Sequence, residues 1–169
     1  VAQLTEMLNV SADVLPERVA GMVARLKEAE RELARTKQAN LASNLTSILG
    51  SHTDIGDVRL WAFRAPDDLG GGELRDLIQR GIGLTRPDIP VAMIGSSAAD
   101  GKLSLVAAVN GLGQERGLSA SAALQAALPS IEGRGGGKAD TAQGGGTRTA
   151  GLNDAFEAVT DYVRSVAGK

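Results

Sequence analysis

The chain of 169 residues contains no cysteine and a single histidine, His52. Without cysteine there is no disulfide framework and no thiolate chemistry, so we expect a reducing compartment and a cytoplasmic location. A zinc site needs several cysteine or histidine ligands, and one histidine does not supply them. Nothing resembles a signal peptide, and no apolar run is long enough to span a bilayer, so we expect no membrane partner.

Aromatic residues make up only 2% of the chain, so the core has to be built from aliphatic side chains. The same shortage argues against recognition of splayed single-stranded bases by stacking on aromatic rings. An excess of positive charge is also missing, because the formal net charge is −2. Proteins that bind nucleic acid over a broad surface are strongly basic, so any anion-binding surface here has to be local.

The motifs of common catalytic sites are missing too. There is no GxSxG serine elbow, and no histidine is placed to activate a serine. The P-loop pattern fails at Glu132 and at Ala139, and the dinucleotide fingerprint fails at Lys138. We therefore expect neither a catalytic residue nor a metal or cofactor site in this chain.

Residues 1–50 are predicted to form a helical arm, made of a short helix over 1–9 and a long helix that ends near Leu49. An apolar stripe runs along the long helix with a period of seven residues, which is typical of packing against one partner helix in a coiled coil. The stripe consists of Val19, Leu26, Leu33 and Asn40. It favours self-association into a homodimer. The alternative is that the same chain covers the stripe.

Residues 51–169 are predicted to form a small globular α+β domain with a mixed sheet flanked by helices. A turn-rich break over 50–57 precedes it, and Asp100-Gly101 lies between two apolar runs, which is the strongest short-range hairpin signal. The segment 58–64 alternates like a half-buried strand, and Ser119 is placed to cap a helix. The predicted strands cover 58–64, 91–96 and 103–109, and the predicted helices cover 73–82, 120–128 and 152–166.

The most informative segment runs from Gly133 to Gly146, with the sequence GRGGGKADTAQGGG. Seven glycines in fourteen residues indicate a surface formed by the backbone, or a flexible linker. The specific residues between the two glycine runs argue against a linker. Consecutive amides beside Arg134, Lys138 and Arg148 suit phosphate binding. The alternative is that the glycines only permit close packing of a tight loop, strand and turn, and both explanations stand at this stage.

The pattern Gly133-x-Gly135-Gly136-Gly137-Lys138-x-Asp140-x-Ala142-Gln143-Gly144-Gly145-Gly146 resembles the signature of the DHH-associated domain, in the form that ends bacterial alanyl-tRNA synthetases. The order of the arm, strand, helix, hairpin, alanine-rich helix, glycine motif and final helix extends the resemblance over the whole chain. Two positions depart from the pattern. Ala139 stands where proline is frequent and Thr141 where an apolar residue is usual, which affects loop stiffness or local packing.

The resemblance implies that the chain is the C-terminal tRNA-binding module of an alanine–tRNA ligase and part of a longer protein. In that family the module contacts the elbow of the tRNA, here tRNA(Ala), and helps to couple the upstream aminoacylation and editing domains. ATP, magnesium and zinc belong to the full-length enzymes and not to this module. The module can also contribute to self-association.

Within the matched motif, side-chain charge and backbone amides point to a set of RNA-binding candidates. They are Arg134, Gly135, Gly136, Gly137, Lys138, Gln143, Gly144, Gly145, Gly146 and Arg148. Phosphoesterases of the DHH family carry a related domain, so the substrate-binding half of such an enzyme remains an alternative. That alternative requires an upstream metal domain, and the AQGGG ending of the motif is less typical of it.

Overall fold

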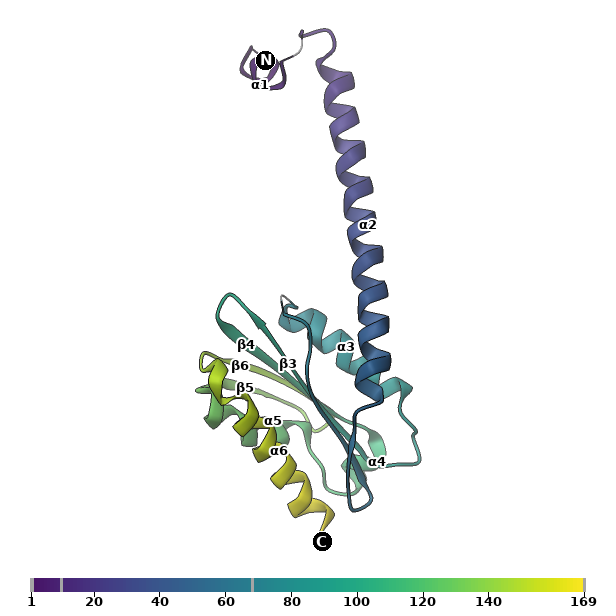
Figure 1. Ribbon diagram of the computed structural model, residues 1–169, viewed down its shortest axis with the longest axis vertical. Coiled ribbons are helices and arrows are strands. Elements are labelled where there is room, and N and C mark those ends of the chain that lie inside the picture. The colour runs from purple at the N-terminus through teal and green to yellow at the C-terminus, as the bar shows by residue number, and fades with distance from the viewer. Residues whose placement is uncertain (1, 10, 68, 169) are drawn as a thin grey trace. The chain divides into compact units, whose positions relative to one another are not determined.

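A computed structural model describes residues 2–9, 11–67 and 69–168, and the chain divides into two compact units (Figure 1). The first unit ends at Ser43 and contains helix α1 (Ala2–Leu8) and most of helix α2 (Leu15–Leu49). The second unit begins at Asn44, and in it the last turn of α2 buries Leu45 and Ile48. The two predicted helices of the arm are therefore present.

The second unit is built on one six-stranded sheet with the strand order β1-β2-β3-β4-β6-β5. Strands β2 and β3 are parallel and all other neighbours are antiparallel, which confirms the predicted α+β fold with a mixed sheet. Its elements are β1 (Thr53–Ile55), β2 (Val58–Arg64), α3 (Gly71–Leu84), β3 (Val91–Ala99), β4 (Lys102–Val109), α4 (Gly111–Glu115), α5 (Ala120–Ala127), η1 (Leu128–Ile131), β5 (Arg134–Gly137), β6 (Thr141–Gly146), η2 (Thr149–Gly151) and α6 (Leu152–Ala167).

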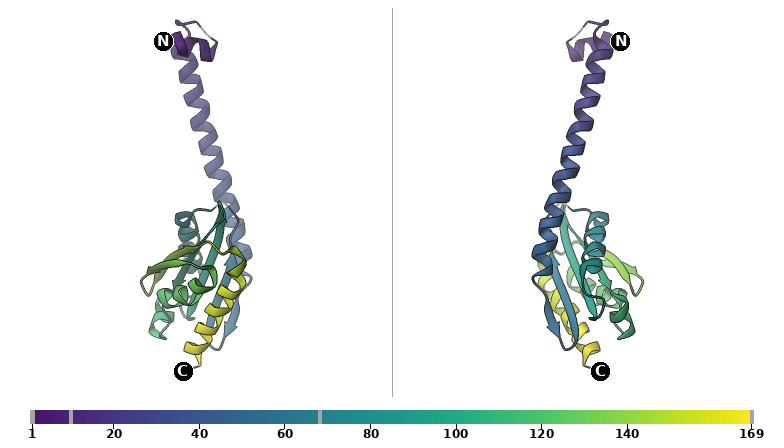
Figure 2. Two further views of the ribbon diagram at one scale, coloured as in Figure 1. Left: turned by 90° about the vertical axis from the view of Figure 1, so that its left-hand side faces the viewer. Right: turned by 90° about the vertical axis from the view of Figure 1, so that its right-hand side faces the viewer.

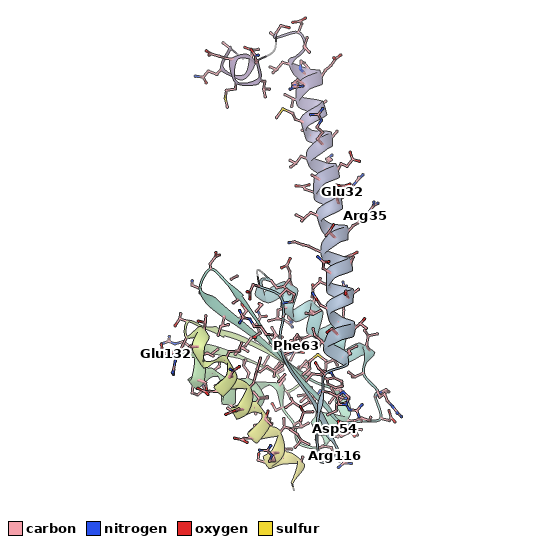
Figure 3. All side chains as sticks on the ribbon, viewed as in Figure 1. Glu32, Arg35, Asp54, Phe63, Arg116 and Glu132 are labelled. Atoms are coloured by element: carbon pink, nitrogen blue, oxygen red, sulfur yellow. The ribbon has the colours of Figure 1, made fainter. Side chains whose placement is uncertain are left out.

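Helices cover both faces of this sheet. On one face α5 and α6 pack on the strands, and Leu105, Leu124 and Val159 are fully buried between them. Helix α3, which connects β2 to β3, covers the other face. There Gly95 makes room for two neighbours, because a Cβ at Gly95 would lie 2.8 Å from Phe63 Cζ and 2.9 Å from Ile78 Cδ1. Phe63 accordingly lies in the middle of this unit (Figure 3).

This double cover corrects the expectation of a half-buried strand at 58–64. The strand has the predicted bounds, but Trp61 and Phe63 are buried along with Val58 and Leu60. Alternating side chains along a strand point to opposite faces of the sheet, and here a helical layer covers each of the two faces. The arrangement of the covering helices, which the alternation does not encode, decides that both sets of side chains are buried.

Strand β1 and helix α4 are among the short elements that were not predicted. Strand β1 lies within the segment expected to be a turn-rich break, and it pairs with β2 through a turn in which Gly56 has a φ of +63°. Helix α4 follows β4 directly, capped by the side chain of Asn110, which accepts a hydrogen bond from the Gly113 N–H at 2.8 Å. Both elements are too short to show a periodic pattern in the sequence.

The strongest local signals are confirmed. Asp100 and Gly101 have φ values of 51° and 72°, which is the conformation of a two-residue type I′ turn between β3 and β4. Ser119 caps α5 by accepting a hydrogen bond from the Ala122 N–H at 3.4 Å. None of the helices within the described residues has the length and apolarity needed to cross a membrane.

Two adjacent serines of β3 provide a test of this packing. Ser96 and Ser97 are both buried, but Ser97 Oγ donates to the Leu69 carbonyl at 2.7 Å whereas Ser96 Oγ has no hydrogen-bond partner. We expect Ser96→Ala to raise the free energy of unfolding by about 1 kcal/mol, because it removes an unsatisfied buried hydroxyl. Ser97→Ala should lower it by about 1–2 kcal/mol, because it leaves a carbonyl unpaired. Urea unfolding of both variants measures the difference, and equal shifts of the same sign would contradict it.

Candidate functional site

The glycine stretch forms an ordered hairpin of two strands, β5 and β6, at the edge of the sheet (Figure 2). A tight turn over residues 138–140 connects them, and the Lys138 N–H donates to the Thr141 carbonyl at 2.8 Å. Strand β6 also pairs with β4 over its whole length, so the hairpin belongs to the main sheet. The flexible linker is thereby excluded.

The glycines are explained by the close approach of backbones in this hairpin. A Cβ at Gly135 would collide with the Cα of Gly144, and one at Gly137 would collide with the Cα of Ala142. On the inner side, a Cβ at Gly145 would lie 2.5 Å from the Leu103 carbonyl oxygen of β4. Gly136 is different, since a Cβ there would meet no atom within 4 Å. Close packing, one of the two explanations that the sequence left open, therefore accounts for most of the motif.

Helix α5 packs against the hairpin and hydrogen-bonds to its turn and to β5. The Ala120 N–H donates to the Ala139 carbonyl at 2.8 Å, and the Ser121 N–H donates to the Lys138 carbonyl at 3.1 Å. Further along, Gln125 Nε2 donates to the Gly135 carbonyl at 3.0 Å. The amides of Ala120 and Ser121 at the N-terminus of α5 are thus used within the fold.

The amides of the stretch do not form the predicted phosphate cradle. An anion nest needs successive residues that alternate between right- and left-handed conformations. Among the described glycines, a positive φ occurs at Gly56, Gly101 and Gly117, none of which lies in the stretch. Gly144 and Gly145 pair with β4 on one side and β5 on the other. The cradle is therefore corrected to a strand pair, and any anion binding here has to rely on side chains and on the exposed surface of β5.

One polar pocket of about 290 Å³ lies between this hairpin and α3. It contains two cationic side chains, Arg75 and Lys138, and one carboxylate, Asp140. The lining residues are Arg75, Gln79, Gly136, Gly137, Lys138, Asp140, Thr141, Ala142 and Gln143. Gln143 is placed by contact with the start of α3, since a Cβ at Gly71 would collide with its Nε2. We call this site the α3 pocket. It brings together four of the predicted residues: Gly136, Gly137, Lys138 and Gln143.

Arg75 is the residue that the sequence analysis missed. It lies on the exposed side of α3, far from the glycine motif in the chain, and the α3–β4 packing brings it to the hairpin. An arginine on an amphipathic helix is normally a solvated charge, so nothing in its local sequence distinguishes it. Only the packing of α3 on the sheet shows that this helix faces the glycine strands.

The opposite face of the hairpin carries a second pocket, of about 300 Å³, against α5 and η1. Its lining residues are Gln125, Leu128, Pro129, Gly133, Arg134 and Gly135. We call this site the α5 pocket. It holds Arg134 and Gly135 of the predicted set. Arg148 lines neither pocket; it is exposed after β6, and its N–H donates to the Ile131 carbonyl at 3.0 Å. Six of the ten predicted residues are therefore divided between the two pockets, and the other four, Gly144, Gly145, Gly146 and Arg148, line neither.

The cations near the hairpin differ from several others in this unit, which are paired with carboxylates. Within the described residues, none of Arg75, Arg134, Lys138 and Arg148 forms an ion pair. By contrast, Arg59 contacts Asp54 at 2.9 Å, and this hydrogen bond lowers the pKa of the Asp54 carboxyl. Arg116 pairs with Asp57 at 2.5 Å. Asp54 and Arg116 lie at the end of the unit opposite Glu132, which precedes the glycine stretch (Figure 3). The cations beside the hairpin are thus available to an external anion.

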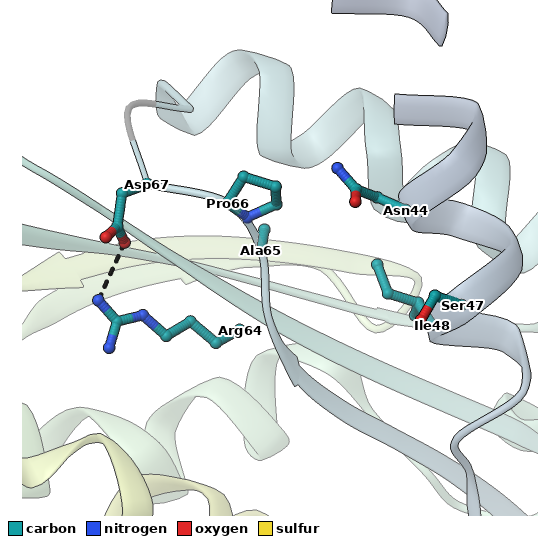
Figure 4. Close-up of a pocket in the computed structure, with 7 residues that line it drawn as sticks. All are labelled: Asn44, Ser47, Ile48, Arg64, Ala65, Pro66 and Asp67. Carbon is teal, nitrogen blue, oxygen red and sulfur yellow. Dashed lines mark hydrogen bonds and ion pairs between the residues drawn. The ribbon is translucent and has the colours of Figure 1, made fainter. Parts of the chain in front are cut away.

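A third pocket, of about 410 Å³, lies between the last turn of α2 and the segment after β2 (Figure 4). It contains none of the predicted residues. Its arginine, Arg64, is paired with Asp67 at 2.9 Å, so the pocket has no unpaired cation to attract an anion. Among the residues that the structure describes, no three histidine or acidic side chains cluster in a way that would hold a metal ion.

Comparison with known proteins identifies the relatives of this chain. A family model described as the DHHA1 domain matches residues 57–165. The alanine–tRNA ligase of Nocardioides sp. is 40% identical over 167 residues, which cover 99% of this chain and 18% of the ligase. That of Saccharopolyspora erythraea is 40% identical over 162 residues, covering 94% and 18%. The chain thus spans about a fifth of the length of these relatives.

Solved structures show the same fold. The C-Ala domain of alanyl-tRNA synthetase from Aquifex aeolicus matches with a TM-score of 0.60 and 22% identity, over 68% of this chain and 98% of that domain. RecJ from Thermus thermophilus matches with a TM-score of 0.53 and 19% identity, over 97% of this chain and 28% of RecJ. At this level of identity the likeness concerns the fold alone.

Two glycine substitutions test the explanation of the motif. Gly135→Ala should lower the free energy of unfolding by about 3 kcal/mol, because the new methyl group forces β5 away from β6. Gly136→Ala is the matched control and should change it by less than about 0.5 kcal/mol, because its methyl group points into open space. Urea unfolding compares the two, and similar losses for both variants would contradict close packing as the reason for the glycines.

Proposed function

The chain belongs to the DHHA1 domain family, and from this premise we propose that it is the C-terminal tRNA-binding module of an alanine–tRNA ligase. Relatives that match almost the whole chain at 40% identity are alanine–tRNA ligases, which supports this assignment over the phosphoesterase alternative. In the proposal, the partner is tRNA(Ala), and the module contacts the elbow of its folded structure.

The observation that carries the proposal is the α3 pocket, in which two unpaired cations, Arg75 and Lys138, face a wall of glycine backbone. A phosphodiester is anionic, and guanidinium and ammonium groups bind it by charge-assisted hydrogen bonds. Glycine strands present no side chains, so a bulky sugar–phosphate backbone can approach them closely. Gln79 and Gln143 add amide groups that can bond to ribose hydroxyls.

This arrangement suits a folded RNA better than a single strand. Folded RNA is recognised largely by its shape and through phosphate and 2′-hydroxyl contacts. A net charge of −2 and a local group of cations make the binding weak and sensitive to salt in the isolated module. In the proposal, aminoacylation and editing take place in upstream domains, with ATP, magnesium and zinc there, and the module helps to couple those activities by holding the same tRNA.

The double variant Arg75→Ala/Lys138→Ala tests the RNA site. We expect it to weaken binding of the full chain to a tRNA(Ala) transcript at least tenfold at low salt. The slope of log K against log salt concentration should decrease in magnitude by about one for each lost phosphate contact. Fluorescence anisotropy of labelled tRNA measures both quantities.

Arg80→Ala is the matched control, since it removes an exposed arginine of α3 that does not line the pocket. It should leave the affinity within about twofold of the unchanged chain, because Arg80 is not among the residues that would contact the RNA in the α3 pocket. The α3 pocket is the wrong site if the double variant and the Arg80 variant bind tRNA equally.

Dimerisation is the second candidate function, and the exposure of the apolar stripe favours it. Within the first unit, Leu26 and Leu33 are 60% and 58% exposed, and Val19 is 43% exposed. Regularly spaced exposed leucines on a helix are typical of an unpaired coiled-coil seam. We propose that two copies pair through this stripe, with Asn40 as the polar position that sets the register.

A charge in the stripe tests the dimer. We expect the unchanged chain to sediment as a dimer at micromolar concentration and Leu26→Glu to sediment as a monomer, because the pairing would bury two facing carboxylates. Ala24→Glu is the matched control, since Ala24 is exposed and lies about half a turn away around the helix. It should remain a dimer in sedimentation-velocity analysis. A monomeric unchanged chain at high concentration would rule this candidate out.

A further inference from the structure

The α5 pocket differs in chemistry from the α3 pocket on the other face of the hairpin. Its floor is apolar, formed by Leu128, which is 5% exposed, and by the ring of Pro129. One wall is the backbone of Gly133 and Gly135, which have no side chains. The single charged group is Arg134. A volume of about 300 Å³ is at the small end of ligand pockets, so one planar group fits and a folded peptide does not.

Gln125 gives this pocket a defined hydrogen-bonding edge. Its Nε2 donates one N–H to the Gly135 carbonyl at 3.0 Å, which holds the carboxamide in place. A carboxamide has two N–H groups and a carbonyl oxygen, so one N–H and the oxygen remain for a ligand. A glutamine that presents a donor and an acceptor together matches the N7 and N6 positions of adenine.

From these contacts we infer that the α5 pocket binds one unpaired adenine base of the RNA. The guanidinium plane of Arg134 stacks on the base, the Leu128–Pro129 floor covers its other face, and Gln125 bonds to its edge. The two pockets share β5, with Gly135 in one and Gly136 in the other, so neighbouring nucleotides of one strand reach both. Arg134 and Pro129 thus cover the two faces of the base, a role that aromatic rings, which are few in this chain, have in many RNA-binding proteins.

This inference rests on the proposed RNA-binding function, and the test separates the two. The full chain is titrated with labelled oligoribonucleotides of equal length, made of adenine, cytosine or uracil, and with the tRNA(Ala) transcript. We expect the adenine oligonucleotide to bind about tenfold more tightly than the other two. Gln125→Leu should abolish this preference. Pro129→Glu should also abolish the preference for adenine, because the new carboxylate replaces part of the apolar floor. This variant leaves the hydrogen bond between Gln125 and Gly135 intact.

Arginine stacking is tested by charge-conserving replacement. Arg134→Ala should weaken binding of the adenine oligonucleotide about tenfold, and Arg134→Lys should not restore it, because an ammonium lacks the planar face. The double variant Arg75→Ala/Lys138→Ala should weaken all oligonucleotides alike and keep the preference for adenine.

Binding of tRNA without a preference among the three oligonucleotides would overturn the adenine pocket and leave the proposed function intact. Full recovery by Arg134→Lys would overturn the stacking role. Absence of binding to tRNA and to every oligonucleotide would overturn the proposed function itself, and the adenine pocket with it.

Discussion

The close approach of the β5 and β6 backbones is the constraint on which the rest of the site depends. At Gly135 and Gly137 the facing strand leaves no room for a Cβ, and at Gly145 the neighbouring β4 leaves none. This compact strand pair allows α5 to bond to the hairpin, where Ala120 and Ser121 donate to carbonyls of the turn and Gln125 donates to the Gly135 carbonyl of β5. The glycines thus have a structural role first, and they form a thin wall with a pocket on each side.

The two faces of the β5–β6 hairpin differ in their surface chemistry. On the α3 side Lys138 and Arg75 make a polar surface, and on the α5 side Arg134 faces an apolar floor. Neither surface has its cations neutralised by carboxylates of the fold, whereas Arg59, Arg64 and Arg116 are paired. Paired surface charges contribute little to stability, but they no longer attract an anion. Arg75, Arg134 and Lys138 therefore give the hairpin a local anion-binding capacity although the chain as a whole is slightly acidic.

Much of the fold was predictable because its signals are local. The Asp100-Gly101 turn, the Ser119 cap and the apolar periodicity of α6 each depend on a few consecutive residues, and each is present in the structure. Strand β1 and helix α4 are held by long-range contacts instead. Strand β1 is stabilised by its pairing with β2. Helix α4 is anchored by Asn110, whose side chain caps the helix and also accepts a hydrogen bond from the Val91 N–H at 2.9 Å. Their sequences alone are too short to specify them.

The sequence by itself determined the family, because the spacing and residue types of the glycine motif are properties of the chain. It also determined which charged side chains lie next to the motif in the chain. It also determined that bulky side chains are absent from the stretch. Only the tertiary structure decided that the amides of Gly144 and Gly145 are used in the sheet, that Lys138 and Arg134 lie on opposite faces, and that Arg75 joins Lys138. The physical reason is that strand register and the packing of α3 and α5 bring distant segments together, and no local pattern encodes which side of a strand will meet which helix.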